Sequence, residues 1–270
     1  MADKVLKIAA IQMVSVKNWQ INLQVAERLI KEAALNSVQL VILPEFFIQI
    51  SDAHSLDRFK IAEELGYGVI QSNLARIAAE NRIYLLAGSI PLKSEDATRF
   101  YNTSIMYDPN GELLCSCNKI HLFKFNDGAN VYDEGIDFVA GNQLVCCDIA
   151  GFKIGLSICY DLRFPEFFRA LGVVDVMLLP AAFTYTTGLA HWELLLRARA
   201  VENQCYFIGV NQGGLHESGR RTYGHSLVCD PWGELIVSCD EGEQIIYADL
   251  LSSRLMEVRA KLPALEHRQL

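Results

Sequence analysis

Short runs of valine, isoleucine and leucine alternate with segments of helical periodicity along almost the whole 270-residue chain. This alternation is typical of α/β proteins, in which helices cover buried strands. Helices are predicted over 18–36, 69–81, 165–172, 191–203 and 252–261. Strands are predicted over 5–13, 38–44, 83–90, 102–107, 112–118, 144–149, 152–159, 175–181, 205–211, 224–229, 234–239 and 244–249.

Two distant segments repeat one pattern. Ser104–Leu113 and Ser226–Leu235 each read as a strand, an Asp-Pro-x-Gly turn and a second strand. Two similar α/β halves would bury their sheets against each other and leave their helices outside. The repeat therefore predicts a four-layer α-β-β-α sandwich, formed as a single domain over residues 1–270. Chance similarity between two common patterns is the alternative.

The charge balance restricts the partners of the chain. Asp and Glu number 32 against 24 Lys and Arg, which gives a formal net charge of −8. Nucleic acids and anionic membranes bind clustered Lys and Arg, so we expect neither as a partner. No apolar run approaches the roughly 18 residues of a membrane span. A small molecule or a second copy of the chain is the expected partner.

Eight cysteines raise the question of disulfides or metal. The first residues lack the basic and apolar regions of a secretory signal, so we expect a cytoplasmic, reducing location and free thiols. Cys115-x-Cys117 and the adjacent Cys146-Cys147 lack the separated CxxC pairs of a zinc site, so no metal is expected. Most of these residues are expected to be small buried hydrophobes. The cysteines are Cys115, Cys117, Cys146, Cys147, Cys159, Cys205, Cys229 and Cys239.

Three polar residues stand where a predicted strand ends, which is where open α/β sheets place ligands. They are Glu45, Lys119 and Cys159. Taken singly, a charged residue at the end of an apolar strand is usually exposed at the protein surface and has no catalytic role. Together they form a reactive set, because a thiol needs a base to become a nucleophile and a cation would stabilise the oxyanion formed on attack.

Other nucleophile arrangements fit the sequence less well. His121 reads as a structural, hydrogen-bonded histidine, and no signature pairs an imidazole with Cys159. The segment around Ser157 lacks the second glycine of the GxSxG nucleophile elbow, so we expect Ser157 to be a buried strand residue and not a nucleophile. Walker A and dinucleotide-binding fingerprints are missing, which disfavours kinases and Rossmann oxidoreductases.

The segments around these three residues resemble the catalytic motifs of the nitrilase superfamily of carbon-nitrogen hydrolases, in the same order. The resemblance implies the α-β-β-α sandwich. It also implies that Glu45 is the general base, Lys119 the oxyanion stabiliser and proton donor, and Cys159 the nucleophile. A second active-site glutamate of the family matches Glu134, although the preceding loop, 124–128, departs from the usual acidic pattern. The motifs are Leu43-Pro-Glu45-Phe, Asn118-Lys119-Ile-His-Leu-Phe123 and Ser157-Ile-Cys159-Tyr-Asp-Leu-Arg163-Phe-Pro-Glu166.

Within the superfamily the chain looks most similar to the deaminated glutathione amidase and ω-amidase branch. By this resemblance Phe183 and Thr187 would line the substrate pocket. The planar fork of Arg163 could then clamp a substrate carboxylate, and the Tyr160 backbone N–H would help Lys119 to stabilise the oxyanion. The alternatives are an Arg163 paired with Asp161 or Glu166, a core Phe183 and a loop Thr187.

These observations predict an amidase that cleaves a small carboxylate-bearing amide through a cysteine thioester, with no cofactor, and that assembles as a homodimer or larger homo-oligomer. An N-carbamoyl amino acid amidohydrolase or a nitrilase could use the same three residues. A non-catalytic regulatory protein of this fold and a thiol-redox protein are further alternatives.

Overall fold

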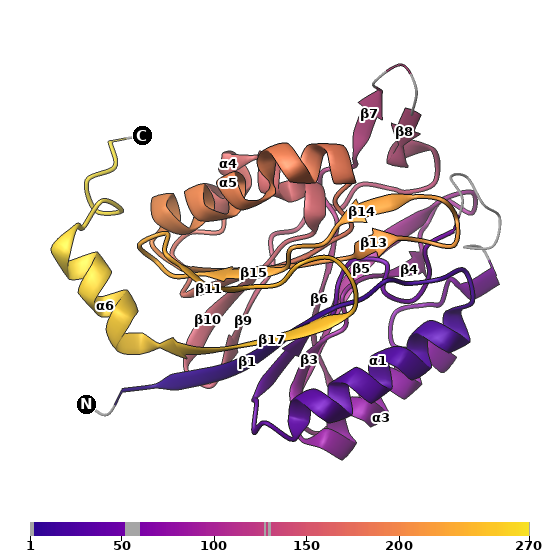
Figure 1. The fold of residues 1–270 in the computed structure, drawn as a ribbon, viewed down its shortest axis with the longest axis horizontal. Coiled ribbons are helices and arrows are strands. Elements are labelled where there is room, and N and C mark those ends of the chain that lie inside the picture. The colour runs from indigo at the N-terminus through magenta and orange to yellow at the C-terminus, as the bar shows by residue number, and fades with distance from the viewer. Residues whose placement is uncertain (1–2, 52–59, 127, 129–130, 270) are drawn as a thin grey trace.

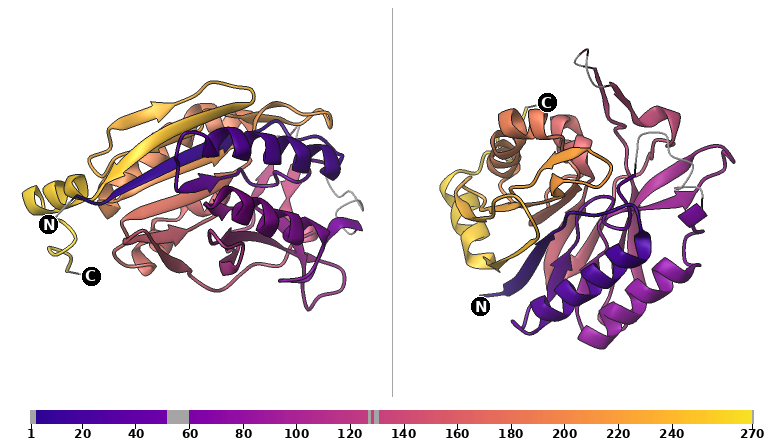
Figure 2. Two further views of the ribbon diagram at one scale, coloured as in Figure 1. Left: turned by 90° about the horizontal axis from the view of Figure 1, so that it is seen from below. Right: turned by 45° about the vertical axis from the view of Figure 1, so that its right-hand side comes forward.

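Two sheets packed face to face form the centre of the molecule, and helices cover both outer faces (Figures 1 and 2). The computed structural model describes residues 3–51, 60–126, 128 and 131–269. The seven-stranded sheet runs β17 (Gln244–Leu251), β1 (Val5–Gln12), β2 (Leu40–Ile42), β3 (Tyr84–Leu86), β5 (Phe100–Tyr107) and β4 (Ile90–Lys93), with β6 (Leu113–Asn118) also paired to β5. The six-stranded sheet runs β16 (Leu235–Ser238), β15 (Leu227–Cys229), β12 (Tyr206–Asn211), β11 (Val176–Ala181), β10 (Phe152–Leu156) and β9 (Cys146–Ile149).

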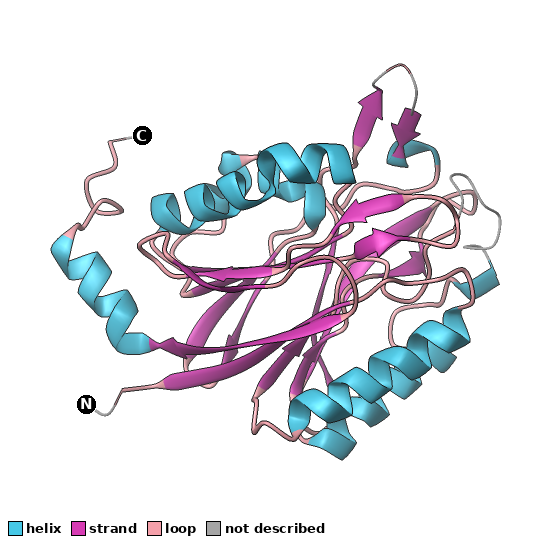
Figure 3. Cartoon of the chain, in the orientation of Figure 1, coloured by secondary structure: helices cyan, strands magenta, loops and turns pink. Residues whose placement is uncertain are grey.

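The helices form the two outer layers (Figure 3). One layer, against the seven-stranded sheet, holds α1 (Trp19–Ala34) and α3 (Val69–Asn81). The other layer holds α4 (Pro165–Ala170) and α5 (Tyr185–Asn203), while α6 (Ser252–Lys261) lies beside the two chain ends (Figure 1). The four-layer α-β-β-α sandwich predicted from the sequence is therefore confirmed.

Strand β1 shows how the sequence fills two cores. Successive side chains of a strand point to opposite faces. Ile8 and Ala10 pack into the core between the sheets, whereas Ala9 and Ile11 pack into the core beneath α1 and α3. A strand covered on both faces must be apolar throughout, which explains why these strands appear as continuous runs rather than alternating patterns.

The two repeated segments fold as equivalent hairpins. Both β5–β6 and β15–β16 are antiparallel, and each shows a register shift just before its turn. In each turn an aspartate side chain, Asp108 or Asp230, accepts hydrogen bonds from the two backbone N–H groups two and four residues later. The final turn glycines have φ of 80° and 84°, a conformation that glycine adopts without strain. The predicted repeat is therefore confirmed.

Some predicted boundaries are wrong. Helix α5 starts at Tyr185 instead of residue 191, because a first turn of Tyr-Thr-Thr-Gly carries little helical signal. The predicted strand 152–159 ends at Leu156, and the predicted strand 83–90 divides into β3 and β4. Two short hairpins were not predicted from the sequence; they consist of β7 (Lys124–Asn126) with β8 (Val131–Asp133), and β13 (Gly213–Leu215) with β14 (Arg221–Tyr223).

Histidine 216 anchors the β13–β14 hairpin. Its Nδ1 lies 2.9 Å from the Ser15 carbonyl oxygen and its Nε2 lies 2.7 Å from Thr222 Oγ1. Since a carbonyl oxygen can only accept, Nδ1 carries the proton, and Nε2 accepts from the hydroxyl. Burial lowers the pKa of His216 to about 4, so the ring is neutral in the folded protein near pH 7.

This histidine should make the protein less stable in mild acid. Between pH 6.5, the ordinary His pKa, and about 4 the unfolded chain binds a proton that the folded chain does not, so the free energy of unfolding falls by up to about 3 kcal/mol. In His216→Gln this part of the fall should disappear. Urea unfolding of both proteins between pH 7.5 and 4 measures it, and parallel pH profiles would contradict the assignment.

Candidate active site

Both sheets deliver side chains to one buried cluster. Glu45 follows β2 and Lys119 follows β6, both in the seven-stranded sheet, while Cys159 follows β10 of the six-stranded sheet. Glu134 begins the short 3-10 helix η1 (Glu134–Ile136) after β8. The structure thus brings together the four residues that the sequence analysis predicted to be catalytic.

A buried chain of charges joins three of them. Lys119 Nζ lies 2.9 Å from Glu45 Oε1 and 2.7 Å from Glu134 Oε2, and both Lys119 and Glu45 are only 1% exposed. Glu134 Oε2 also accepts from the Phe123 backbone N–H at 2.8 Å. Burial alone would lower the pKa of Lys119, but the carboxylates of Glu134 and Glu45 outweigh it and hold the pKa above its usual value. Lys119 is therefore a fixed cation at neutral pH.

Glu45 is held in place by further donors. Asn102 Nδ2 donates to Glu45 Oε1 at 2.9 Å, and the Ala182 backbone N–H donates to Oε2 at 2.8 Å. Asn102 comes from β5 and Ala182 follows β11, so the carboxylate is fixed from both sheets. A side chain fixed in this way can act on a neighbouring proton without rearranging first.

Cys159 occupies a strained turn between strand and helix. Its φ is +46°, in the left-handed region that residues other than glycine rarely adopt, and it opens the 3-10 helix η2 (Cys159–Arg163). Asp161 holds this turn, because its carboxylate accepts from the Ile158 N–H at 2.9 Å and from the His121 N–H at 3.0 Å. Such strain persists only where surrounding contacts enforce it, and it is frequent at catalytic nucleophiles.

The thiol of Cys159 is protonated at rest. Burial raises its pKa well above the usual value and the Glu45 carboxylate raises it further, against the opposing charge of Lys119. A neutral thiol is a weak nucleophile, so its proton must pass to a base as the new bond forms. Glu45 is a carboxylate in the same pocket and can accept it.

The pocket around Cys159 is narrow. Its free volume of ≈ 10 Å³ has room for about one water molecule, so side chains must move apart to admit a substrate. Phe183 and Thr187 line it, and Thr187 belongs to the first turn of α5 and not to a loop. The lining residues are Glu45, Phe123, Glu134, Cys159, Tyr160, Ala182, Phe183, Thr184, Thr187 and Arg220.

Arg163 lies beside this pocket. Its guanidinium is 5.9 Å from the ring centre of Tyr160 and 5.6 Å from that of Phe183, and its Nη2 is 3.2 Å from His191 Nδ1. The alternative of an ion pair with Asp161 or Glu166 is wrong, since no carboxylate of the described residues lies within 4.0 Å of it. His121 and Ser157 have the structural roles predicted for them, hydrogen-bonded to Asp161 and to the Leu178 carbonyl oxygen.

The sequence analysis did not single out three residues that belong to the site: Asn102, Asp161 and Arg220. A polar residue inside a buried strand, such as Asn102 in β5, is a usable signal because apolar strands rarely contain one without a partner. Arg220 had no local signal, since the turn after β13 reads as an ordinary polar loop.

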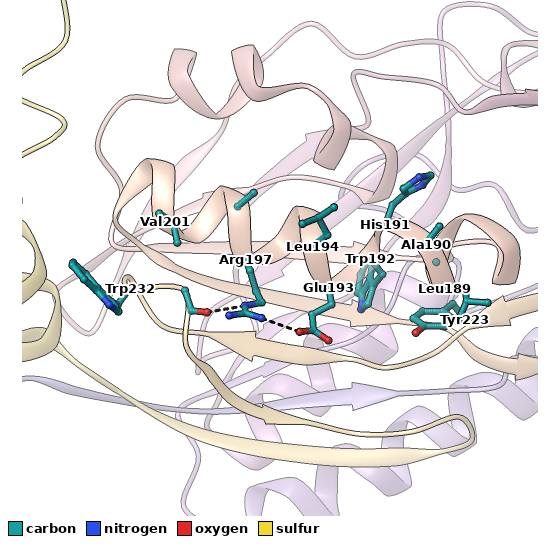
Figure 4. Close-up of a pocket in the computed structure, with 13 residues that line it drawn as sticks. Leu189, Ala190, His191, Trp192, Glu193, Leu194, Arg197, Val201, Tyr223 and Trp232 are labelled. Atoms are coloured by element: carbon teal, nitrogen blue, oxygen red, sulfur yellow. Dashed lines mark hydrogen bonds and ion pairs between the residues drawn. The ribbon is translucent and has the colours of Figure 1, made fainter.

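A larger hollow of ≈ 700 Å³ lies on the outer face of α5 and contains none of the predicted catalytic residues (Figure 4).

No group of three or more His, Cys, Asp or Glu side chains within the described ranges is arranged to hold a metal ion. None of the helices described is both long and apolar enough to cross a membrane. All eight cysteines are free; five are buried, and Cys115, Cys146 and Cys147 are half-buried.

Comparisons with known proteins agree with this geometry. A family model described as carbon-nitrogen hydrolase matches residues 7–260. Deaminated glutathione amidase of Synechocystis is 39% identical over 96% of this chain and 97% of its own length. Omega-amidase NIT2 of Mus musculus is 36% identical over 98% of this chain and 94% of its own.

The solved structures give the same result. Nit3 of Saccharomyces cerevisiae, described as a member of branch 10 of the nitrilase superfamily, superposes with a TM-score of 0.88 at 31% identity, covering 99% of this chain and 97% of that one. The matched regions include all the motifs from Glu45 to Cys159. The chain therefore belongs to the carbon-nitrogen hydrolase family, the nitrilase superfamily that its three motifs resemble.

Proposed function

We propose that the protein is an amidase that hydrolyses the C–N bond of a small carboxylate-bearing amide, either deaminated glutathione or a 2-oxo acid ω-amide. The buried chain Glu45–Lys119–Glu134 beside the Cys159 thiol supports this proposal most directly. The names of the two relatives support the amide class.

The first half of the reaction forms a thioester. Glu45 takes the proton of Cys159 while the sulfur attacks the amide carbonyl, and the carbonyl π electrons move onto oxygen. Lys119 and the Tyr160 backbone N–H stabilise this oxyanion. When the tetrahedral intermediate collapses, the C–N bond breaks and the nitrogen leaves with the proton that Glu45 took from Cys159, which returns Glu45 to its carboxylate form.

The second half consumes water. Glu45 deprotonates a water molecule that attacks the thioester, the C–S bond breaks, and the sulfur recovers its proton as the acid is released. Glu134, bonded to Lys119 and to the Phe123 N–H, holds the lysine in position through both halves. Every step uses groups of this chain, the substrate and water, and no cofactor is proposed.

A product-release assay across four substrate classes tests this proposal. Purified protein is incubated with deaminated glutathione, 2-oxoglutaramate, an N-carbamoyl amino acid and a simple nitrile. We expect turnover of the first or second and at least about 100-fold lower kcat/KM for the other two. Preferential cleavage of the carbamoyl compound or the nitrile would replace the proposed function with one of those activities. Failure to cleave any of the four would contradict it.

We also propose that the active protein is a homo-oligomer in the cytoplasm. The outer face of α5 exposes Leu189 and Leu194, which are 64% and 67% exposed, and Trp232 lies at the Val201 end of the same hollow (Figure 4). On the same helix Glu193 and Arg197 carry opposite charges, so two copies of this face can pair about a two-fold axis. His191 also faces this hollow and contacts Arg163, which connects the proposed interface to the pocket. Free, partly exposed thiols are consistent with a reducing compartment.

Leu194→Glu should shift the protein toward monomer, because it places a charge in the centre of an apolar contact. Light scattering after gel filtration measures the mass. Leu35→Glu, at an 86% exposed position after α1, is the control and should leave the mass unchanged. Equal masses for all three proteins would exclude this face as the interface.

A further inference from the structure

Arg220 is a cation in the catalytic pocket that the proposed reaction does not use. It lies in the turn between β13 and β14 and lines the pocket together with Glu45 and Cys159. Its Nη2 donates to the Ala182 carbonyl oxygen at 3.0 Å, but its buried Nε donates to no atom of the described residues. The adjacent Arg221, by contrast, points outward and pairs with Glu241 at 2.7 Å.

No carboxylate of the described residues lies within 4.0 Å of Arg220. A partly buried guanidinium without an anion is costly, and the unpaired Nε of Arg220 is a donor that a carboxylate oxygen would satisfy. Arg220 is thus available to a ligand and is not committed to the catalytic charges.

A series of contacts between aromatic rings connects Arg163 with Arg220. Arg163 lies over Tyr160, whose ring is 5.2 Å from Phe123. Phe123 is in turn 6.0 Å from Tyr132, and the Arg220 guanidinium lies 5.7 Å from the centre of the Tyr132 ring. Of these five residues, Phe123, Tyr160 and Arg220 line the pocket that holds Cys159.

We infer that Arg220 is a second carboxylate anchor of this pocket, and that it selects amides with a carboxylate on each side of the scissile bond. Arg163 holds one carboxylate and Arg220 the other, so that the amide carbonyl is placed at Cys159 between them. The preferred substrate class is then an acyl amino acid or acyl peptide with an acidic acyl group, in preference to a primary amide with a single carboxylate. This inference rests on the proposed function and specifies its substrate.

Two substrates and three variants test the inference. Deaminated glutathione has a carboxylate on each side of the amide, whereas 2-oxoglutaramate has one on the acyl side only. Arg220→Gln should lower kcat/KM for deaminated glutathione by about 10- to 100-fold, chiefly through KM, and change that for 2-oxoglutaramate by less than about twofold. Arg220→Lys should recover part of the loss, and Arg221→Gln should behave as the unmodified protein.

A third substrate gives a readout that needs no variant. The unmodified protein should cleave deaminated glutathione with its terminal carboxylate converted to a carboxamide about 10- to 100-fold less efficiently. Arg220→Gln should show almost no difference between the acid and the carboxamide, because the two changes remove the same contact.

Three results would overturn the inference. An equal loss on deaminated glutathione and 2-oxoglutaramate would assign Arg220 to the catalytic charges or to the fold, and an unchanged kcat/KM for deaminated glutathione would remove it from substrate binding. Either result leaves the proposed amidase function intact. An unmodified protein that cleaves none of these amides would overturn the inference and the proposed function together.

Discussion

Cys159→Ala should lower kcat by about 10⁴-fold or more and leave the fold unchanged. The substitution removes the only atom that can form the thioester, and the remaining groups cannot supply a substitute nucleophile at the same place. Since the side chain loses only one sulfur atom in a pocket that is already nearly closed, we expect the free energy of unfolding to change by no more than about 1 kcal/mol. Steady-state assays and urea unfolding measure the two quantities.

Cys205→Ala is the matched control. Cys205 is buried as well, precedes β12 and lies outside the lining of the catalytic pocket. It should lose stability slightly and keep full activity. Near-normal turnover by Cys159→Ala would remove Cys159 as the nucleophile, and a similar loss in both variants would point to a general effect of removing a buried thiol.

Lys119→Met should abolish activity and destabilise the protein. The substitution leaves the carboxylates of Glu45 and Glu134 facing each other in a buried site without the cation that separates them. Removing one partner from a buried ion pair typically costs about 3–5 kcal/mol. It also removes the cation that we propose for the oxyanion. Urea unfolding and the product-release assay give the two effects separately.

The double variant Lys119→Met/Glu134→Gln separates charge balance from catalysis. Glu134→Gln replaces one of the two buried carboxylates with a neutral amide, so the free energy of unfolding should recover in part. Activity should stay lost, because no cation faces the reacting carbonyl. Activity in the double variant would show that Lys119 acts only by neutralising Glu134, and unchanged stability in Lys119→Met would show that the lysine does not hold the carboxylates.

The sequence predicted the layers of the fold because its strands are nearly uniform apolar runs. Strands buried on both faces produce such runs, and the Asp-Pro-x-Gly turns mark the two equivalent hairpins. The short hairpins β7–β8 and β13–β14 were missed since each of their strands has only three residues and pairing depends on distant contacts, such as His216 with Ser15. The start of α5 was missed because tertiary packing overrides a weak helical propensity there.

The residues of the candidate active site were likewise predictable from the sequence only in part. Glu45, Lys119 and Cys159 could be found from sequence because each is a polar residue at the end of an apolar strand. Arg220 could not, because nothing in its own turn distinguishes it from Arg221. The two arginines differ only in direction, toward the pocket or toward Glu241, and side-chain direction in a turn is decided by the packing of the hairpin. The single carboxylate clamp predicted at Arg163 therefore omitted half of the arrangement that we infer.

The pairing of β1 with β17 has a consequence for how this chain is made. Val5 lies opposite Leu251, so this edge of β1 stays uncovered until β17 has been synthesised. During synthesis that edge presents unpaired N–H and C=O groups to other nascent chains, a template for aggregation. Pairing at such long sequence separation is also slow. Production of the protein should therefore depend on slow translation or chaperone protection more than its final stability suggests.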